Sequence, residues 1–79
     1  MDPDQERKHL AQADRHIAET KKRIARQRVI VQNAINNGHR SIEAESMLRA
    51  FEESLRLFEK HRQLILNFLA KAKELPQSK

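Results

Sequence analysis

The sequence predicts an all-α protein, an antiparallel two-helix hairpin that we expect to dimerise into a four-helix bundle. A single glycine, Gly38, lies almost at the midpoint of the 79 residues, between two long segments rich in helix-forming residues. In the second segment, apolar residues recur at alternating steps of three and four. In the first, large apolar residues recur every seven positions: Leu10, Ile17, Ile24 and Val31. Both spacings place apolar side chains along one face of a helix, as in a coiled coil.

The first helix is expected over about residues 3–37. Asp2 can accept hydrogen bonds from first-turn amides, and Pro3 suits the first helical position. No further glycine or proline interrupts the pattern before Gly38. Glycine is the natural left-handed residue after a helix end, so the first helix is predicted to stop there.

A turn over about residues 38–40 leads to a second helix over about 41–75. Ser41 is the expected N-cap, and Pro76 forbids regular hydrogen bonding beyond it. Residues 76–79 are expected to be a frayed tail. Because so short a connection forces the helices to run antiparallel, the whole chain 1–79 is predicted to be one helical-hairpin domain.

The seam between the helices is expected to combine the two heptad patterns: Leu10, Ile17, Ile24, Val31, Leu48, Phe51, Leu55, Phe58, Ile65 and Leu69. We expect facing residues to have numbers that sum to about 79, which puts Ile35 near Ile42. Arg62 occupies a seam position. Its guanidinium is expected either to pair with Glu19 or to extend into solvent.

The second helix carries more apolar surface than this seam covers. Leu57, Leu64 and Phe68 form an adjacent stripe, which predicts an oligomer interface. A homodimer is the simplest partner for it, since a two-helix hairpin has little core of its own. Two alternatives remain open, namely a monomer whose Lys and Arg stems cover the stripe, and a different helical protein as partner.

The chain has a formal net charge of +5, from sixteen Lys and Arg against eleven Asp and Glu. A basic run in the first helix is expected to lie beside Glu52, Glu53 and Glu59, and ion pairing of this kind is the favoured role. RNA or DNA binding is the less favoured alternative. The candidate phosphate contacts are Lys21, Lys22, Arg23, Arg26 and Arg28.

No catalytic, cofactor-binding or metal-binding residues are predicted, and the chain is expected not to be an enzyme. Glu6 and His9 have the E-x-x-H spacing of di-iron bundles. The further inward carboxylates of such a site are missing, however, and Glu6 is expected to face solvent. His9, His16 and His61 are expected at the edge of the helix interface. Whether they make assembly sensitive to pH is open.

We expect a cytoplasmic protein with no membrane contact. The chain has no cysteine, which suits a reducing compartment. Its acidic N-terminus is not followed by the apolar region of a signal peptide, and no apolar run approaches the roughly 18 residues that cross a bilayer.

The stretch HLAQADRHIAETKKRIARQRVIV from His9 to Val31, with Gly38-His39, Met47-Leu48 and Phe51-Glu52 after it, resembles a group of small uncharacterised helical proteins of bradyrhizobia and related soil alphaproteobacteria. The resemblance implies a bacterial cytoplasmic origin. It implies no particular activity, because the group has no established one. The expected dimer is similar in architecture alone to Rop, a two-hairpin bundle that binds paired RNA loops. The favoured function is a self-associating interaction or regulatory module, and the alternative is a basic nucleic-acid-binding bundle.

Overall fold

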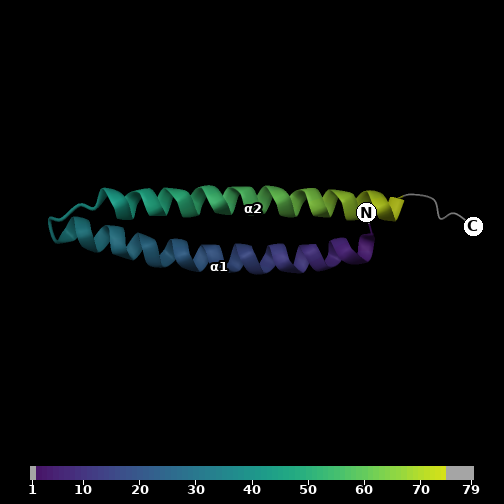
Figure 1. Ribbon diagram of the computed structural model, residues 1–79, viewed down its shortest axis with the longest axis horizontal. Coiled ribbons are helices and arrows are strands. Elements are labelled where there is room, and N and C mark those ends of the chain that lie inside the picture. The colour runs from purple at the N-terminus through teal and green to yellow at the C-terminus, as the bar shows by residue number, and fades with distance from the viewer. Residues whose placement is uncertain (1, 75–79) are drawn as a thin grey trace, which may run out of the picture.

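The computed structural model describes residues 2–74, which form two α-helices and no strand. Helix α1 spans Pro3–Asn36 and α2 spans Ile42–Glu74. The helices run antiparallel and lie side by side (Figure 1), which confirms the all-α hairpin. The expected helix end at Leu75 and the expected tail 76–79 lie outside the described residues.

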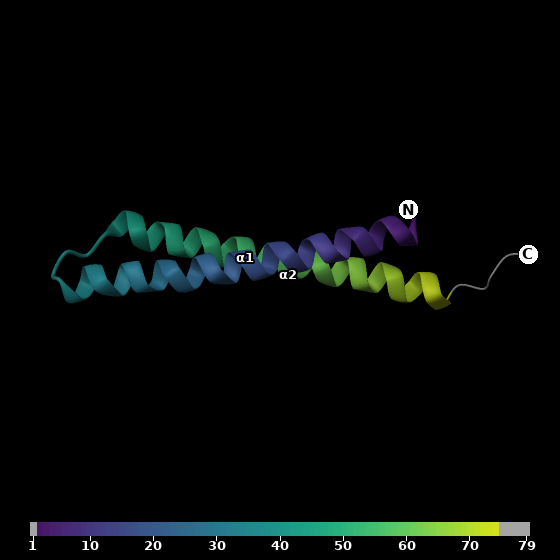
Figure 2. The same cartoon turned by 90° about the horizontal axis from the view of Figure 1, so that it is seen from below.

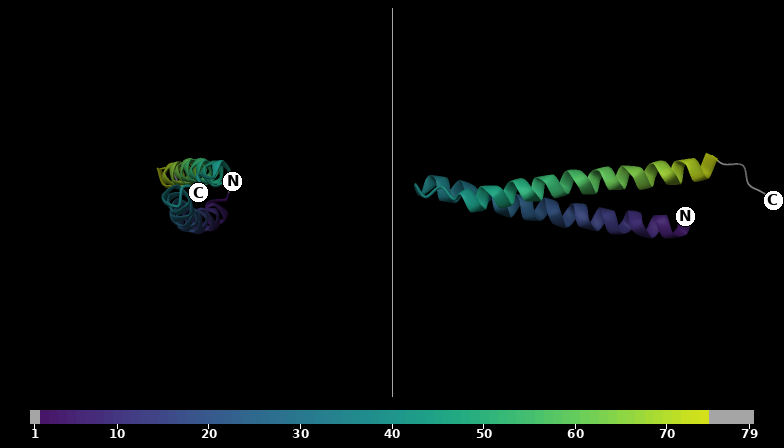
Figure 3. Two further views of the ribbon diagram at one scale, coloured as in Figure 1. Left: turned by 90° about the vertical axis from the view of Figure 1, so that its left-hand side faces the viewer. Right: turned by 45° about the horizontal axis from the view of Figure 1, so that its top comes forward.

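The hairpin is a thin rod about 14 Å across, and its helices of 34 and 33 residues are each about 50 Å long at 1.5 Å per residue. Seen at right angles to Figure 1, the helices cross near their middles (Figure 2). The view along the rod (Figure 3, left) shows the two helices packed against each other. Each helix therefore buries a single stripe and leaves most of its surface uncovered by the other.

Both helices begin with the caps that the sequence predicts. The Asp2 carboxylate accepts a 3.1 Å hydrogen bond from the Asp4 amide, with Pro3 as the first helical residue. At the start of α2, the Ser41 hydroxyl accepts a 3.0 Å hydrogen bond from the Ala44 amide. These bonds satisfy amide groups that a helix N-terminus otherwise leaves without partners.

Helix α1 ends in a Schellman motif. Gly38 has a φ of 74°, the left-handed conformation that favours glycine. Its amide donates to the carbonyl of Ile35 at 3.0 Å, and the amide of His39 donates to the carbonyl of Ala34 at 2.8 Å. The chain thus reverses direction within two residues of the helix end.

The seam between the helices is thin. Ile24 and Ile65 are buried, and the other eight predicted seam residues are half-buried. Small or polar residues occupy the alternate buried positions of α1, namely Glu6, Ala13, Thr20 and Gln27. Among the described residues no large side chain is completely buried, so this core is small for a stable domain.

The numbers of residues in contact across the seam sum to values on both sides of the expected 79, for example 74 for His16 with Phe58, 76 for Asp14 with Arg62 and 80 for Arg28 with Glu52. The link between the helices, residues 37–41, runs back beside the end of α1 before α2 begins (Figure 1). Ile35 and Ile42, which we expected to meet, are 48% and 73% exposed.

Candidate interaction surfaces

One long side of the hairpin carries the ion pairs between the helices. Arg62 Nε donates to Asp14 Oδ1 at 2.6 Å, and Arg28 Nη2 donates to Glu52 Oε2 at 3.4 Å. Arg28 follows Asp14 by two heptads, so both lie on the same side of α1. The seam arginine Arg62 therefore reaches the edge of the seam and pairs with Asp14, not with Glu19.

The other long side carries exposed apolar side chains. Leu57 and Leu64 are each 59% exposed, and Phe68 is half-buried. They belong to a row on α2 that contains no acidic residue and repeats at alternating steps of three and four. The row, here called the apolar face, consists of Met47, Ala50, Ser54, Leu57, His61, Leu64 and Phe68. Helical spacing of this kind makes the row a second seam that the hairpin leaves without a partner.

Residues of α1 border the apolar face. His61 of α2 lines a shallow hollow together with His9 and His16 of α1. Ile30 follows His16 by two heptads and is exposed, so it extends this side towards Met47 of α2. Leu57, Leu64 and Phe68 were predicted from the sequence to lie on an interface, whereas Met47 and Ile30 were not. Extending the heptad count from Leu57 and His16 would have found both.

Two of these histidines contact a neighbouring side chain, His16 an aromatic ring and His9 a buried carboxylate. The rings of His16 and Phe58 have centroids 5.3 Å apart, and His9 Nδ1 lies 3.1 Å from Glu6 Oε2. The expectation that Glu6 faces solvent is wrong, because this residue is only 5% exposed. It precedes Ala13 by seven residues and so shares its buried row.

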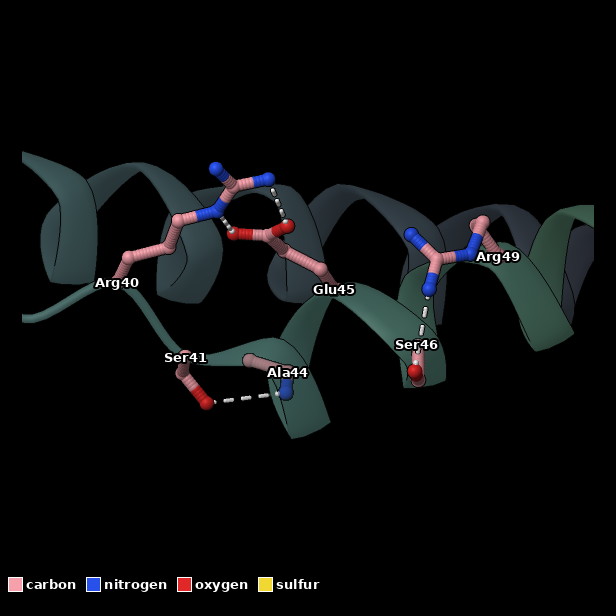
Figure 4. A network of polar contacts seen from close by, with 6 residues as sticks. All are labelled: Arg40, Ser41, Ala44, Glu45, Ser46 and Arg49. Carbon is pink, nitrogen blue, oxygen red and sulfur yellow. Dashed lines mark hydrogen bonds and ion pairs between the residues drawn. The ribbon is translucent and has the colours of Figure 1, made fainter.

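No group of three or more His, Asp or Glu side chains within the described part of the chain is arranged to hold a metal ion. Two hydroxyl groups have local partners. That of Ser41 caps α2, and that of Ser46 accepts from Arg49 at 3.1 Å (Figure 4). Neither hydroxyl is hydrogen-bonded to a base that would activate it.

The basic run does not form one surface, because successive helical residues point in different directions. Arg28 pairs with Glu52, as expected for the ion-pairing role. Lys21 lines the hollow that also contains Glu59. Four members of the run, all exposed, form no ion pair with a described carboxylate: Lys21, Lys22, Arg23 and Arg26. Only Arg28 of the run is thus ion-paired.

A bidentate ion pair joins Arg40, in the link between the helices, to Glu45 in the first turn of α2. Arg40 donates to both carboxylate oxygens of Glu45, at 2.8 and 3.0 Å (Figure 4). These hydrogen bonds lower the pKa of Glu45, and the charge of Arg49 lowers it further. The same bonds raise the pKa of Arg40. A carboxylate held here also lies favourably at the helix N-terminus.

Neither α1 nor α2 has an apolar stretch that would let it span a membrane. Comparisons with protein-family models, with curated proteins and with solved structures give no match for this chain. We therefore infer function from the apolar face and from the unpaired cations of α1.

Proposed function

We propose that the protein is a non-enzymatic interaction module that assembles as a homodimeric four-helix bundle through the apolar face. One observation carries this proposal. Leu57 and Leu64, seven residues apart in the interior of α2, are more than half exposed in the hairpin. Exposed apolar residues that repeat along a helix are typical of a surface that another helix covers.

The thin seam supports the same proposal. Its only buried apolar side chains among the described residues are Ala13, Ile24 and Ile65. Burying a leucine side chain contributes about 1.5–3 kcal/mol, so covering Leu57 and Leu64 in each of two copies adds substantially to so small a core. Dimerisation would supply the stability that a single hairpin of this size lacks.

A second copy fits the apolar face because the face is complementary to itself. The half nearer the turn is lined by small residues, Ala50 and Ser54, whereas the far half has Leu64 and Phe68. An antiparallel pairing about a two-fold axis near residue 59 places Phe68 against the partner's Ala50 and Leu64 against the partner's Ser54. Large residues then face small ones at these two pairs, Leu57 faces the partner's His61 near the axis, and no acidic residues oppose each other.

Sedimentation equilibrium over a wide range of concentrations at physiological salt tests the proposal, with a dimer mass as the expected result. The double variant Leu64→Asp/Phe68→Asp should dissociate the dimer. Gln63→Asp/Asn67→Asp is the matched control, because it adds the same charge to exposed positions of the same helix segment outside the apolar face. Helix content is followed by circular dichroism.

A second variant separates loss of the interface from loss of the fold. Ala50 is exposed in the hairpin, so Ala50→Glu should leave the seam intact while it places a charge against the partner's Phe68. We expect this variant to be a helical monomer at concentrations where the wild type is a dimer. A wild type that is a helical monomer at every concentration would refute self-association, and a foreign helix would then be the partner to seek.

A further inference from the structure

The outer surface of α1, opposite the seam, is basic. Lys8, Arg15 and Lys22 repeat every seven residues along it, and Arg26 lies one turn beyond Lys22. Exposed small residues separate these cations: Ala11, Ala18 and Ala25. We call this surface the basic outer face. From Lys8 to Arg26 it extends about 27 Å, at 1.5 Å per residue.

The cations of this face have no carboxylate partners among the described side chains, in contrast to two of the three arginines of α2, although the α2 lysines Lys60, Lys71 and Lys73 likewise form no ion pair there. Arg56 and Arg62 each donate to an acidic residue, and Arg49 donates to Ser46. Arg15 and Arg26 donate to no described side chain. Two acidic residues of α1 lie near these cations, Glu19 and Asp4, and the Asp4 carboxylate pairs with Arg7. The face therefore has positive charge that is available to an outside anion.

The side chains between the cations restrict the kind of anion. Alanine methyl groups offer too little apolar surface to insert into a bilayer, where amphipathic helices use Leu, Phe or Trp. No aromatic residue other than histidine occurs in α1, so the face cannot stack bases of a single strand. A regular row of fixed phosphates, without exposed bases or an apolar layer, matches it best.

We propose that the basic outer face binds the phosphate backbone of double-stranded nucleic acid without sequence preference. This set differs from the one expected from the sequence. Lys8 and Arg15 belong to the face, whereas the expected contacts Lys21, Arg23 and Arg28 lie outside it. The proposed dimer would bury α2 and leave this face of α1 open. The binding site is therefore independent of whether the chain self-associates.

Binding to a duplex releases counterions, so the affinity should fall as the salt concentration rises, and this dependence can be measured. Each phosphate contact on a duplex lowers the slope of log affinity against log salt by about 0.9. Four cations predict a slope of about −3.6, with micromolar affinity at low salt. Fluorescence anisotropy measures this with the full chain and a labelled random-sequence DNA duplex of about 20 base pairs, titrated at about 50 to 200 mM salt.

The test compares two double variants of equal charge change. Lys22→Glu/Arg26→Glu should weaken binding on the order of tenfold or more and bring the salt slope about two units closer to zero. Lys60→Glu/Lys71→Glu reverses two exposed cations of α2 and should leave affinity within about twofold of the wild type, since neither residue lies on this face. Both variants are first shown to keep the wild-type mass and helix content.

Three results would overturn the proposal. The wild type could fail to bind the duplex at about 50 mM salt, where such contacts are strongest. The two double variants could lose affinity equally, which would indicate attraction by net charge alone. Finally, the protein could sediment with phosphatidylserine vesicles while showing no affinity for the duplex, which would make a membrane surface the partner.

Discussion

The side-chain amide of Gln27 donates a 2.9 Å hydrogen bond to the backbone carbonyl of Ala44, from the middle of one helix to the first turn of the other. Gln27 is only 7% exposed, so this bond lies inside the seam. It joins residues seventeen positions apart in the chain and fixes how far α2 is displaced along α1. A polar residue at a seam position often specifies register in this way.

Gln27→Ala should lower the free energy of unfolding by about 1–2 kcal/mol, because it removes this hydrogen bond and leaves a small cavity. Gln27→Leu keeps the volume and removes the need for a partner, so its stability should match or exceed that of the wild type. Urea unfolding followed by circular dichroism, at one protein concentration, measures both. Gln32→Ala, at an exposed position, is the control. A Gln27→Ala protein as stable as this control would contradict the role of the bond.

Gly38→Ala should destabilise the hairpin by about 1 kcal/mol or slightly more, the cost of the left-handed conformation for a residue with a Cβ atom. No atom lies within 4 Å of the position that this Cβ would occupy, so steric collision adds nothing. Gly38→Asn should cost less, since asparagine tolerates this conformation. Thermal melting at fixed concentration ranks the three proteins. Equal melting temperatures for the Ala and Asn variants would argue against a conformational origin.

The contact with Arg40 gives Glu45 a folded-state pKa below the ordinary value of a glutamate. The stabilisation from this contact is therefore complete above the ordinary pKa and is lost as the pH falls through the lower, folded-state pKa. Arg40→Gln should raise the pKa of Glu45 towards its ordinary value, as measured by carbon NMR of the side-chain carboxyl. Arg49→Gln should raise it less, because Arg49 acts through charge alone. An unchanged Glu45 titration in Arg40→Gln would exclude the hydrogen bonds as the cause.

The absence of native cysteine allows the two-fold axis of the proposed dimer to be located directly. A mixture of Ser54→Cys and Leu64→Cys proteins should form the mixed disulfide under mild oxidation, because the antiparallel pairing brings these positions opposite each other. Ala18→Cys, on the outer surface of α1, should not be cross-linked to Leu64→Cys. Mass spectrometry distinguishes the products. Cross-linking of Leu64→Cys to the control at the same rate would point to random collision.

Local features of this fold could be predicted from the sequence, and distant ones could not. Asp2, Ser41 and Gly38 act on their own helix ends, so residue type and position sufficed to assign their roles. The heptad residues likewise identified the two faces that meet. The partner of Arg62 was missed because it depends on how far one helix is displaced along the other, which residue types do not reveal.

The apolar face was predicted only in part for a related reason. Leu57, Leu64 and Phe68 attract notice because they are large, whereas Ala50 and Ser54 matter only through their position in the same row. Glu6 was misplaced because its charge suggested exposure, although its spacing from Ala13 indicated burial. Position within the heptad was a better guide than side-chain character in both cases.

The antiparallel register also orders the steps of folding. The Gln27 to Ala44 contact closes a loop of 17 residues, whereas the Asp14 to Arg62 contact spans 48. Loop-closure entropy grows with the logarithm of length, which makes the longer closure costlier by about 0.9 kcal/mol if it forms alone. The chain should accordingly zip from the Gly38 end towards the termini, with each layer of the seam shortening the loop that the next must close. Unfolding should begin at the opposite end, where Glu6 and His9 lie.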